Sequence, residues 1–220
     1  MPPRIEVEEH GPYRVSGLSS VKRTWQVETE FGEPIDWGDG QEIGVQDPCR
    51  LCRCGLSKDK PRCDDACVAA GFDGAETAHH GPSSERRQVF VGDGVVLTDE
   101  QRLCTDAGYC GDRFTKVWQM IDETADPEVR ERLKRMVSLC PSGRIQYLLE
   151  EGGEPVEQDF EPAVLVQADG PFLVRGGIPV VGSDGEPYEV RNRMALCRCG
   201  QSGNKPFCDG SHKTTGFRDA

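Results

Sequence analysis

The chain has 220 residues, a net charge of −12 and 11 cysteines. The acidic balance argues against a general nucleic-acid-binding protein, which needs a basic surface. Residues 1–10 lack the apolar segment of a signal peptide, and no apolar stretch is long enough to span a membrane, so we expect a cytoplasmic protein. In that reducing compartment the cysteines favour metal or redox chemistry over disulfides. A hydrophobic content of 36% predicts several small units rather than one large core.

The cysteines form three groups, and the first and last groups belong to a repeat. The matching segments keep the same spacing from the first cysteine of each C-x-C to a final Gly-Phe: Leu51–Gly55 with Leu196–Gly200, Cys63-Asp64 with Cys208-Asp209, and Gly71-Phe72 with Gly216-Phe217. Upstream, Gly11–Val15 echoes Gly170–Val174. The repeat is therefore a whole domain. It predicts a first copy at 1–78, a middle domain at 79–155 and a second copy at 156–220.

Copy two carries a C-x-C pair, eight further residues and then C-x-x-x-H. Three thiolates and one imidazole are enough for one four-ligand metal site. Zinc is the first alternative, but zinc sites typically use C-x2-4-C pairs. A C-x-C pair followed by Cys-Asp-Gly-Ser-His favours a two-iron cluster.

This segment resembles the signature of the CDGSH-type (NEET-like) iron–sulfur domain. The resemblance implies a [2Fe–2S] cluster held by Cys197, Cys199, Cys208 and His212. It also implies a small β-rich fold, often arranged as a two-fold pair, and a role in electron or cluster transfer.

Residues around the motif offer support for such a cluster. Ser202 and Asp209 are expected to bond nearby amides as turn or cap residues. Basic residues also gather near both motifs. Five lie within residues 50–62 of copy one, and those of copy two are Arg191, Arg193, Arg198 and Lys205. Either they stabilise an anionic cluster, or they form only a solvated face.

Copy one has Cys67 where copy two has its histidine. Either Cys52, Cys54, Cys63 and Cys67 hold an all-cysteine [2Fe–2S] cluster, or this site is degenerate and empty. We favour the cluster, because a random replacement would seldom be another good iron ligand. Cys49 competes with Cys67 for this role, and we interpret it as a spare thiol.

The middle domain reads as α+β. Residues 86–98 predict two strands around a Gly-Asp-Gly turn. Phe114, Val117, Trp118 and Ile121 follow helical spacing. Asp126 and Pro127 predict the cap and first residue of a second helix, which ends before Pro141 and is followed by a strand over 144–149.

The middle cysteines are Cys104, Cys110 and Cys140, the last followed by proline. This pattern resembles a single-cluster ferredoxin-like domain in which Ala107 occupies the position of one cysteine. The resemblance implies a [3Fe–4S] cluster, or a [4Fe–4S] cluster whose fourth iron has an oxygen ligand, with Asp106 as the candidate. The alternative is three buried structural cysteines.

We therefore predict an α+β protein with two β-rich CDGSH-type domains flanking a ferredoxin-like module, the two copies packing as a pseudo-dimer within a monomer. Dinucleotide, phosphate-loop and nucleophile-elbow motifs are absent, so we expect no enzyme. Electron transfer with an unidentified redox partner is the favoured function. The alternatives are a cluster carrier for an apo-protein acceptor or a redox or iron sensor, and a structural zinc-binding interaction protein.

Overall fold

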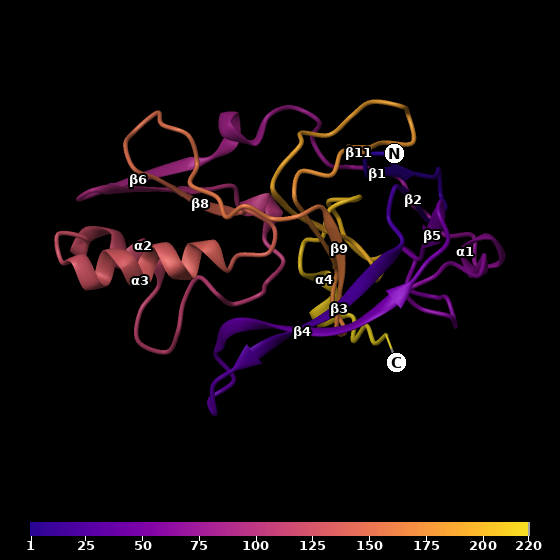
Figure 1. Ribbon diagram of the computed structural model, residues 1–220, viewed down its shortest axis with the longest axis horizontal. Coiled ribbons are helices and arrows are strands. Elements are labelled where there is room, and N and C mark those ends of the chain that lie inside the picture. The colour runs from indigo at the N-terminus through magenta and orange to yellow at the C-terminus, as the bar shows by residue number, and fades with distance from the viewer. Residues whose placement is uncertain (220) are drawn as a thin grey trace.

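The computed structural model describes residues 1–219 and shows a β-rich body joined to a smaller α+β module (Figure 1). The β-rich body contains both copies of the repeat, and both chain termini lie on it. The helices are few and short, as expected for an α+β protein with small CDGSH-type units. Each helix among the described residues is too short or too polar to cross a membrane.

The strands of the two copies exchange partners. Copy one contributes β1 (Arg4–Val7), β2 (Tyr13–Ser16), β3 (Ser20–Glu28), β4 (Pro34–Gly44) and β5 (Cys49–Leu51), and copy two contributes β9 (Ala163–Gln167), β10 (Phe172–Arg175), β11 (Val180–Val181) and β12 (Arg193–Leu196). One sheet has the order β11-β1-β2-β5 and the other β12-β10-β9-β3-β4. The parallel pairs β1–β11 and β3–β9 each join one copy to the other. Copy two therefore lends β11 to the sheet of copy one, and copy one lends β3 and β4 to the sheet of copy two, as subunits do in a swapped dimer.

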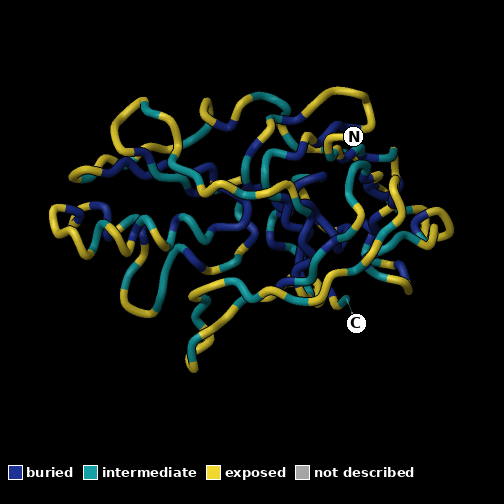
Figure 2. The backbone as a smooth tube through the Cα atoms, in the orientation of Figure 1, coloured by how far each residue is buried: buried dark blue, intermediate teal, exposed yellow. Residues whose placement is uncertain are grey.

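This exchange gives the two copies one shared core. Ile5 and Val15 of copy one are in the same buried cluster as Phe172 and Val174 of copy two. The expectation of separate small cores was thus wrong for the repeat, because exchanged strands cannot bury their apolar faces within one copy. In Figure 2 the buried backbone is densest where the copies meet.

The middle module follows the predicted order of elements. It contains β6 (Gln88–Gly92), β7 (Val95–Asp99), α2 (Val117–Met120), α3 (Pro127–Ser138) and β8 (Ile145–Leu148). Asp126 caps α3 by accepting a hydrogen bond from the Glu128 amide, with Pro127 in the first turn. Leu133 and Val137 of α3 are fully buried against the sheet.

One predicted helical residue lies outside its helix. Phe114 is 80% exposed, and α2 begins only at Val117. Asp112 explains the late start, because its carboxylate accepts hydrogen bonds from the Phe114 and Thr115 amides and holds them in a turn.

The segment that connects copy one to the middle module runs across copy two. The Thr77 and Ala78 amides donate to the Lys205 carbonyl, and the Glu76 carboxylate accepts from the Tyr188 hydroxyl at 2.8 Å. His80 stacks on the Tyr188 ring with centroids 4.1 Å apart. This segment therefore ties all three parts of the chain together.

Candidate metal centres

The copy-two ligand candidates converge at one place, named site 2 here. Cys197 and Cys199 follow β12, and their sulfur atoms are 3.8 Å apart. His212 lies on α4 (Ser211–Thr214), and its Nδ1 is 3.4 Å from the Cys208 sulfur. All four side chains are buried. The structure thus brings together the four residues that the sequence singled out.

Turn residues hold this ligand loop as the sequence predicted. Asp209 accepts hydrogen bonds from the Gly203 and Ser211 amides, and the Ser202 hydroxyl donates to the Phe207 carbonyl at 2.7 Å. The Gly210 amide donates to the Cys208 sulfur. Such bonds fix the loop and stabilise a thiolate over a thiol.

Copy one repeats this arrangement around Cys67, at what we name site 1. The Cys52 and Cys54 sulfur atoms are 3.7 Å apart. Cys52, Cys54 and Cys67 form one buried cluster with Cys63 packed against it. Cys67 lies on α1 (Ala66–Ala69) and is 2% exposed.

Cys49 is placed elsewhere. It lies in β5 opposite Val15 and belongs to the shared apolar core rather than to the thiol cluster. An Asp65 carboxylate oxygen does lie at site 1, within 4.8 Å of the Cys63 and Cys67 sulfur atoms. In copy two this position is Gly210, and nothing in the CDGSH pattern predicts a carboxylate there.

The spacing of the ligands fits metal binding in pairs. Two thiolates on one tetrahedral metal, each about 2.3 Å from it, lie about 3.8 Å apart. The C-x-C pairs at 3.7 Å and 3.8 Å match this value. A thiolate and an imidazole on one such metal are about 3.6 Å apart, close to the 3.4 Å between Cys208 and His212.

The protonation of these groups also favours metal binding. The sulfur–sulfur contact within each C-x-C pair lowers the pKa of the first cysteine, Cys52 or Cys197, and raises that of the second, Cys54 or Cys199. Burial, followed by the charge of Lys213, lowers the pKa of His212. In each pair the first cysteine therefore ionises more readily and the second loses its proton when a metal binds, and His212 is the neutral imidazole that a metal requires.

The arginine inside each C-x-C motif is a buried structural group. Arg53 and Arg198 are each 1% exposed. Arg53 donates to the carbonyls of Gly11, Gly74 and Glu8. Arg198 donates to two carbonyls and pairs with Asp219 at 2.8 Å. Arg191 and Arg193 are also buried, so the basic residues before site 2 do not form a solvated face.

The middle cysteines line a common cavity of about 100 Å³, which we name site 3. Cys104 and Cys110 reach it from one loop, which precedes α2, and Cys140 directly follows the last turn of α3. The Asp106 amide donates to the Cys104 sulfur at 3.4 Å, repeating the bond seen at the other sites. The Asp106 carboxylate instead lies 3.7 Å from the Lys213 amine and is 72% exposed.

Two arginines that sequence reasoning did not assign to site 3 support it. Arg144 lines the cavity and forms a two-pronged ion pair with Asp99, at 2.7 Å and 2.9 Å. Arg193, from copy two, donates to the carbonyls of Val137, Ser138 and Cys140. It therefore caps the negative end of α3 beside a candidate ligand. In the sequence, Cys140-Pro141 indicated that a helix ends beside a candidate ligand. No local pattern indicated that Arg193, on a distant strand, would cap that helix.

Sites 1 and 2 touch through two glycines. Gly55 and Gly200 follow the C-x-C motifs and have φ values of 81° and 77°. A Cβ on Gly55 would lie 2.8 Å from the Cys199 carbonyl oxygen, and one on Gly200 would lie 2.6 Å from that of Cys54. The two ligand loops therefore meet backbone to backbone.

Replacing Gly200 with alanine is expected to lower the free energy of unfolding by about 2–4 kcal/mol. The cost combines left-handed strain with a clash against fixed backbone. Gly185 is the control, because it has a φ of 86° and open space around its Cα. Gly185→Ala should therefore cost only the strain, about 1 kcal/mol. Urea unfolding of both variants measures the difference, and equal losses would contradict the contact.

Site 2 also touches site 3. A Cβ on Gly210 would lie 3.1 Å from the Asp106 Cβ, and the Lys213 amine donates to the Asp106 carbonyl. The loop holding Cys104 therefore covers the loop holding His212. Site 2 is flanked on one side by site 1 and on the other by site 3.

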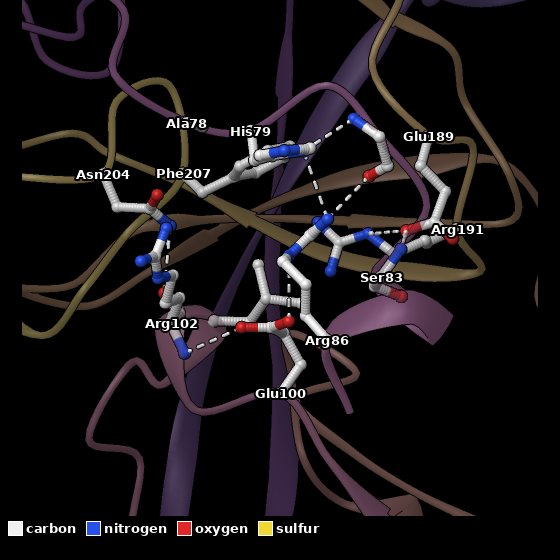
Figure 3. Close-up of a pocket in the computed structure, with 12 residues that line it drawn as sticks. Ala78, His79, Ser83, Arg86, Glu100, Arg102, Glu189, Arg191, Asn204 and Phe207 are labelled. Carbon is white, nitrogen blue, oxygen red and sulfur yellow. Dashed lines mark hydrogen bonds and ion pairs between the residues drawn. The ribbon is translucent and has the colours of Figure 1, made fainter. Parts of the chain in front are cut away.

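A polar cleft lies where the connecting segment, the middle module and copy two meet (Figure 3). Hydrogen bonds and an ion pair between the residues that line it hold the three sites in place. Arg86 pairs with the buried Glu100 at 3.1 Å. The Asn204 amide nitrogen donates to the Arg102 carbonyl, and the Ser83 amide donates to Glu189. These bonds join the connecting segment and the middle module to copy two.

Comparison with known protein families gives two matches. The family described as iron-binding zinc finger CDGSH type matches residues 10–66 and again residues 169–213. The family described as a divergent 4Fe-4S mono-cluster matches residues 90–150. Searches of curated proteins and of solved structures returned no match. The chain is therefore an iron–sulfur cluster-binding protein in which two CDGSH-type domains flank a divergent single-cluster domain.

Proposed function

We propose that the chain is an electron-transfer protein that holds three clusters in a row. In this proposal sites 1 and 2 each hold a [2Fe–2S] cluster and site 3 holds a [3Fe–4S] cluster. The chain's residues bind, insulate and order the clusters, and no catalytic step is assigned to them. The observation that carries the proposal is the contact of the site 2 loops with those of both other sites.

The paired spacing of the ligands favours two irons over one zinc. All four ligands of a single tetrahedral zinc would lie within about 4 Å of one another. Among residues 1–219, no three of Cys197, Cys199, Cys208 and His212 come within 4.8 Å of one another. Two metals, each held by one pair, fit this separation.

The ligands of site 3 favour a three-iron cluster. Cys104, Cys110 and Cys140 supply three thiols, and Ala107 supplies none. An oxygen ligand from Asp106 would give a four-iron cluster instead. Because the Asp106 carboxylate faces solvent and Lys213, we assign site 3 the three-thiolate form.

The iron content tests these assignments. Two [2Fe–2S] clusters and one [3Fe–4S] cluster contain about seven iron atoms per chain. We expect this value, with about eight inorganic sulfides per chain and no zinc, in anaerobically purified protein. Oxidised [3Fe–4S] has an EPR signal, whereas oxidised [2Fe–2S] does not. An EPR-silent oxidised protein with about four iron atoms would show that site 3 is empty.

Electron transfer is tested by the fate of one added electron. A photoreductant delivers one electron per chain, and freeze-quench EPR then follows its redistribution among the sites. We expect the electron to settle on one site regardless of where it entered. An electron that stays where it arrived, together with movement of intact cluster to an apo-ferredoxin, would support a cluster carrier instead.

A further inference from the structure

Tyr13 places a hydroxyl group between the two copies that has no counterpart in the repeat. Its ring is 1% exposed, and its hydroxyl oxygen lies 2.9 Å from the carbonyl oxygens of both Cys197 and Pro206. The matching position in copy two is Phe172. The two rings meet edge to face, with centroids 6.2 Å apart. The two copies therefore differ at the centre of the pseudo-dimer, where copy one has a hydroxyl group that copy two lacks.

This hydroxyl acts on the backbone of a candidate ligand in the other copy. Tyr13 lies on β2, and the Cys197 carbonyl that it contacts immediately precedes the Arg198 amide within the C-x-C loop. The Pro206 carbonyl also accepts from the Cys197 amide, at 2.8 Å. Tyr13 thus locks together the two segments that present Cys197 and Cys208.

Tyr13 also stands next to the ligands of site 1. It pairs with Leu51, the neighbour of Cys52, across β2 and β5. The strand pairing of Leu51 with Tyr13 and the hydrogen bond from the Tyr13 hydroxyl to Cys197 therefore connect the neighbour of Cys52 to Cys197. In the opposite direction Phe172 pairs with Leu196, the neighbour of Cys197, but has no hydroxyl to offer copy one.

The hydroxyl can only act as a donor here. An ordinary tyrosine phenol has a pKa of about 10. The phenol is therefore protonated at neutral pH, and its partners are carbonyl oxygens, which only accept. Its single hydrogen is shared between the Cys197 and Pro206 carbonyls, so the positive end of the O–H dipole faces both.

We propose that Tyr13 is a positioning residue that raises the reduction potential of site 2 relative to site 1. A donor aimed at the backbone of a ligand offsets negative potential at the cluster and favours the reduced state, which carries one more electron. The inference rests on the proposed occupation of both sites by [2Fe–2S] clusters. Tyr13 provides this bias in addition to the difference between His212 and Cys67.

Tyr13→Phe removes the hydroxyl and keeps the ring. We expect the site 2 potential to fall, so that the electron-sharing constant between sites 2 and 1 drops by about threefold to tenfold. A tenfold change corresponds to 59 mV for a one-electron couple. The site 1 potential should stay unchanged, and EPR-monitored titration of the intact protein resolves the two signals.

Tyr188→Phe is the matched control. Tyr188 is a buried copy-two tyrosine whose hydroxyl donates to Glu76 and not to a ligand residue. It should leave both potentials unchanged. An unaltered site 2 potential in Tyr13→Phe, or an equal shift in Tyr188→Phe, would overturn the role of Tyr13.

Phe172→Tyr is the reciprocal test, because it adds a hydroxyl at the matching position of copy two. It also tests the inference if Tyr13→Phe does not fold. By the symmetry of the repeat the new hydroxyl faces the Cys52 and Pro61 carbonyls, so the site 1 potential should rise. A lower or unchanged site 1 potential in the loaded variant contradicts the inference. Wild-type protein without iron at site 2 would instead refute the proposed function itself, so the two failures are distinguishable.

Discussion

Replacing Cys67 with alanine in an Asp65→Asn background is expected to remove about two iron atoms per chain, the content of one [2Fe–2S] cluster. Cys67 is buried among the other three thiols of site 1, and without it one iron loses half of its protein ligands. Asp65 is neutralised because its carboxylate lies within 4.8 Å of the Cys63 and Cys67 sulfur atoms. Within residues 1–219, this carboxylate belongs to the same group of candidate ligands as Cys63 and Cys67 and is able to replace the missing thiolate.

Three controls make this result specific. Cys49→Ala should leave the iron content unchanged, because Cys49 packs in the apolar core opposite Val15. Asp65→Asn alone should also retain all iron. Cys67→Ala alone then shows whether the Asp65 carboxylate replaces Cys67 as an iron ligand. If it does, this variant should retain its iron and have an altered visible spectrum. Loss of iron in Cys49→Ala, with none lost in the double variant, would contradict the ligand assignment.

The elements that the sequence predicted well are those with local signals. Asp126 and Pro127 mark the start of α3, and the structure begins the helix at that proline. The C-x-C loops are also local, since Ser202 and Asp209 act on amides within six residues of themselves. Their geometry follows from turn chemistry, which one segment of sequence contains in full.

Long-range pairing explains what the sequence did not show. The exchange of β3 and β11 between the copies depends on partners more than 140 residues away. Periodicity shows which residues are buried, but not which strand they pair with. Arg193, which caps α3 from another domain, and Tyr13, which reaches Cys197, were missed for the same reason.

The repeat also concealed a difference in exposure between the two sites. Gly210 of site 2 is buried against the Asp106 loop, and Lys213 donates to the Asp106 carbonyl, whereas their counterparts at site 1 are Asp65 and Val68. Val68 is 76% exposed. Site 1 is therefore the more open of the two, and site 2 is buried between its neighbours.

His212 is expected to make site 2 the first site to fail in mild acid. A proton competes with the metal for the imidazole nitrogen, whereas the thiolates of site 1 do not titrate near neutrality while metal holds them. Burial and the charge of Lys213 hold the pKa of His212 below its usual value of about 6.5. The stabilisation that depends on neutral His212 is thus complete above that value and is lost as the pH falls through the lowered pKa.

His212→Cys tests the same difference through two measurements. A thiolate adds one negative charge, so the potential of site 2 should fall, and its loss in acid should move to lower pH by about one unit. Cys67→His should produce the opposite changes at site 1. Visible absorbance and EPR during a titration from pH 7.5 to about 5 would follow each site separately. If both wild-type sites bleach together and His212→Cys alters neither potential, His212 does not ligate metal, and the paired spacing with Cys208 has another cause.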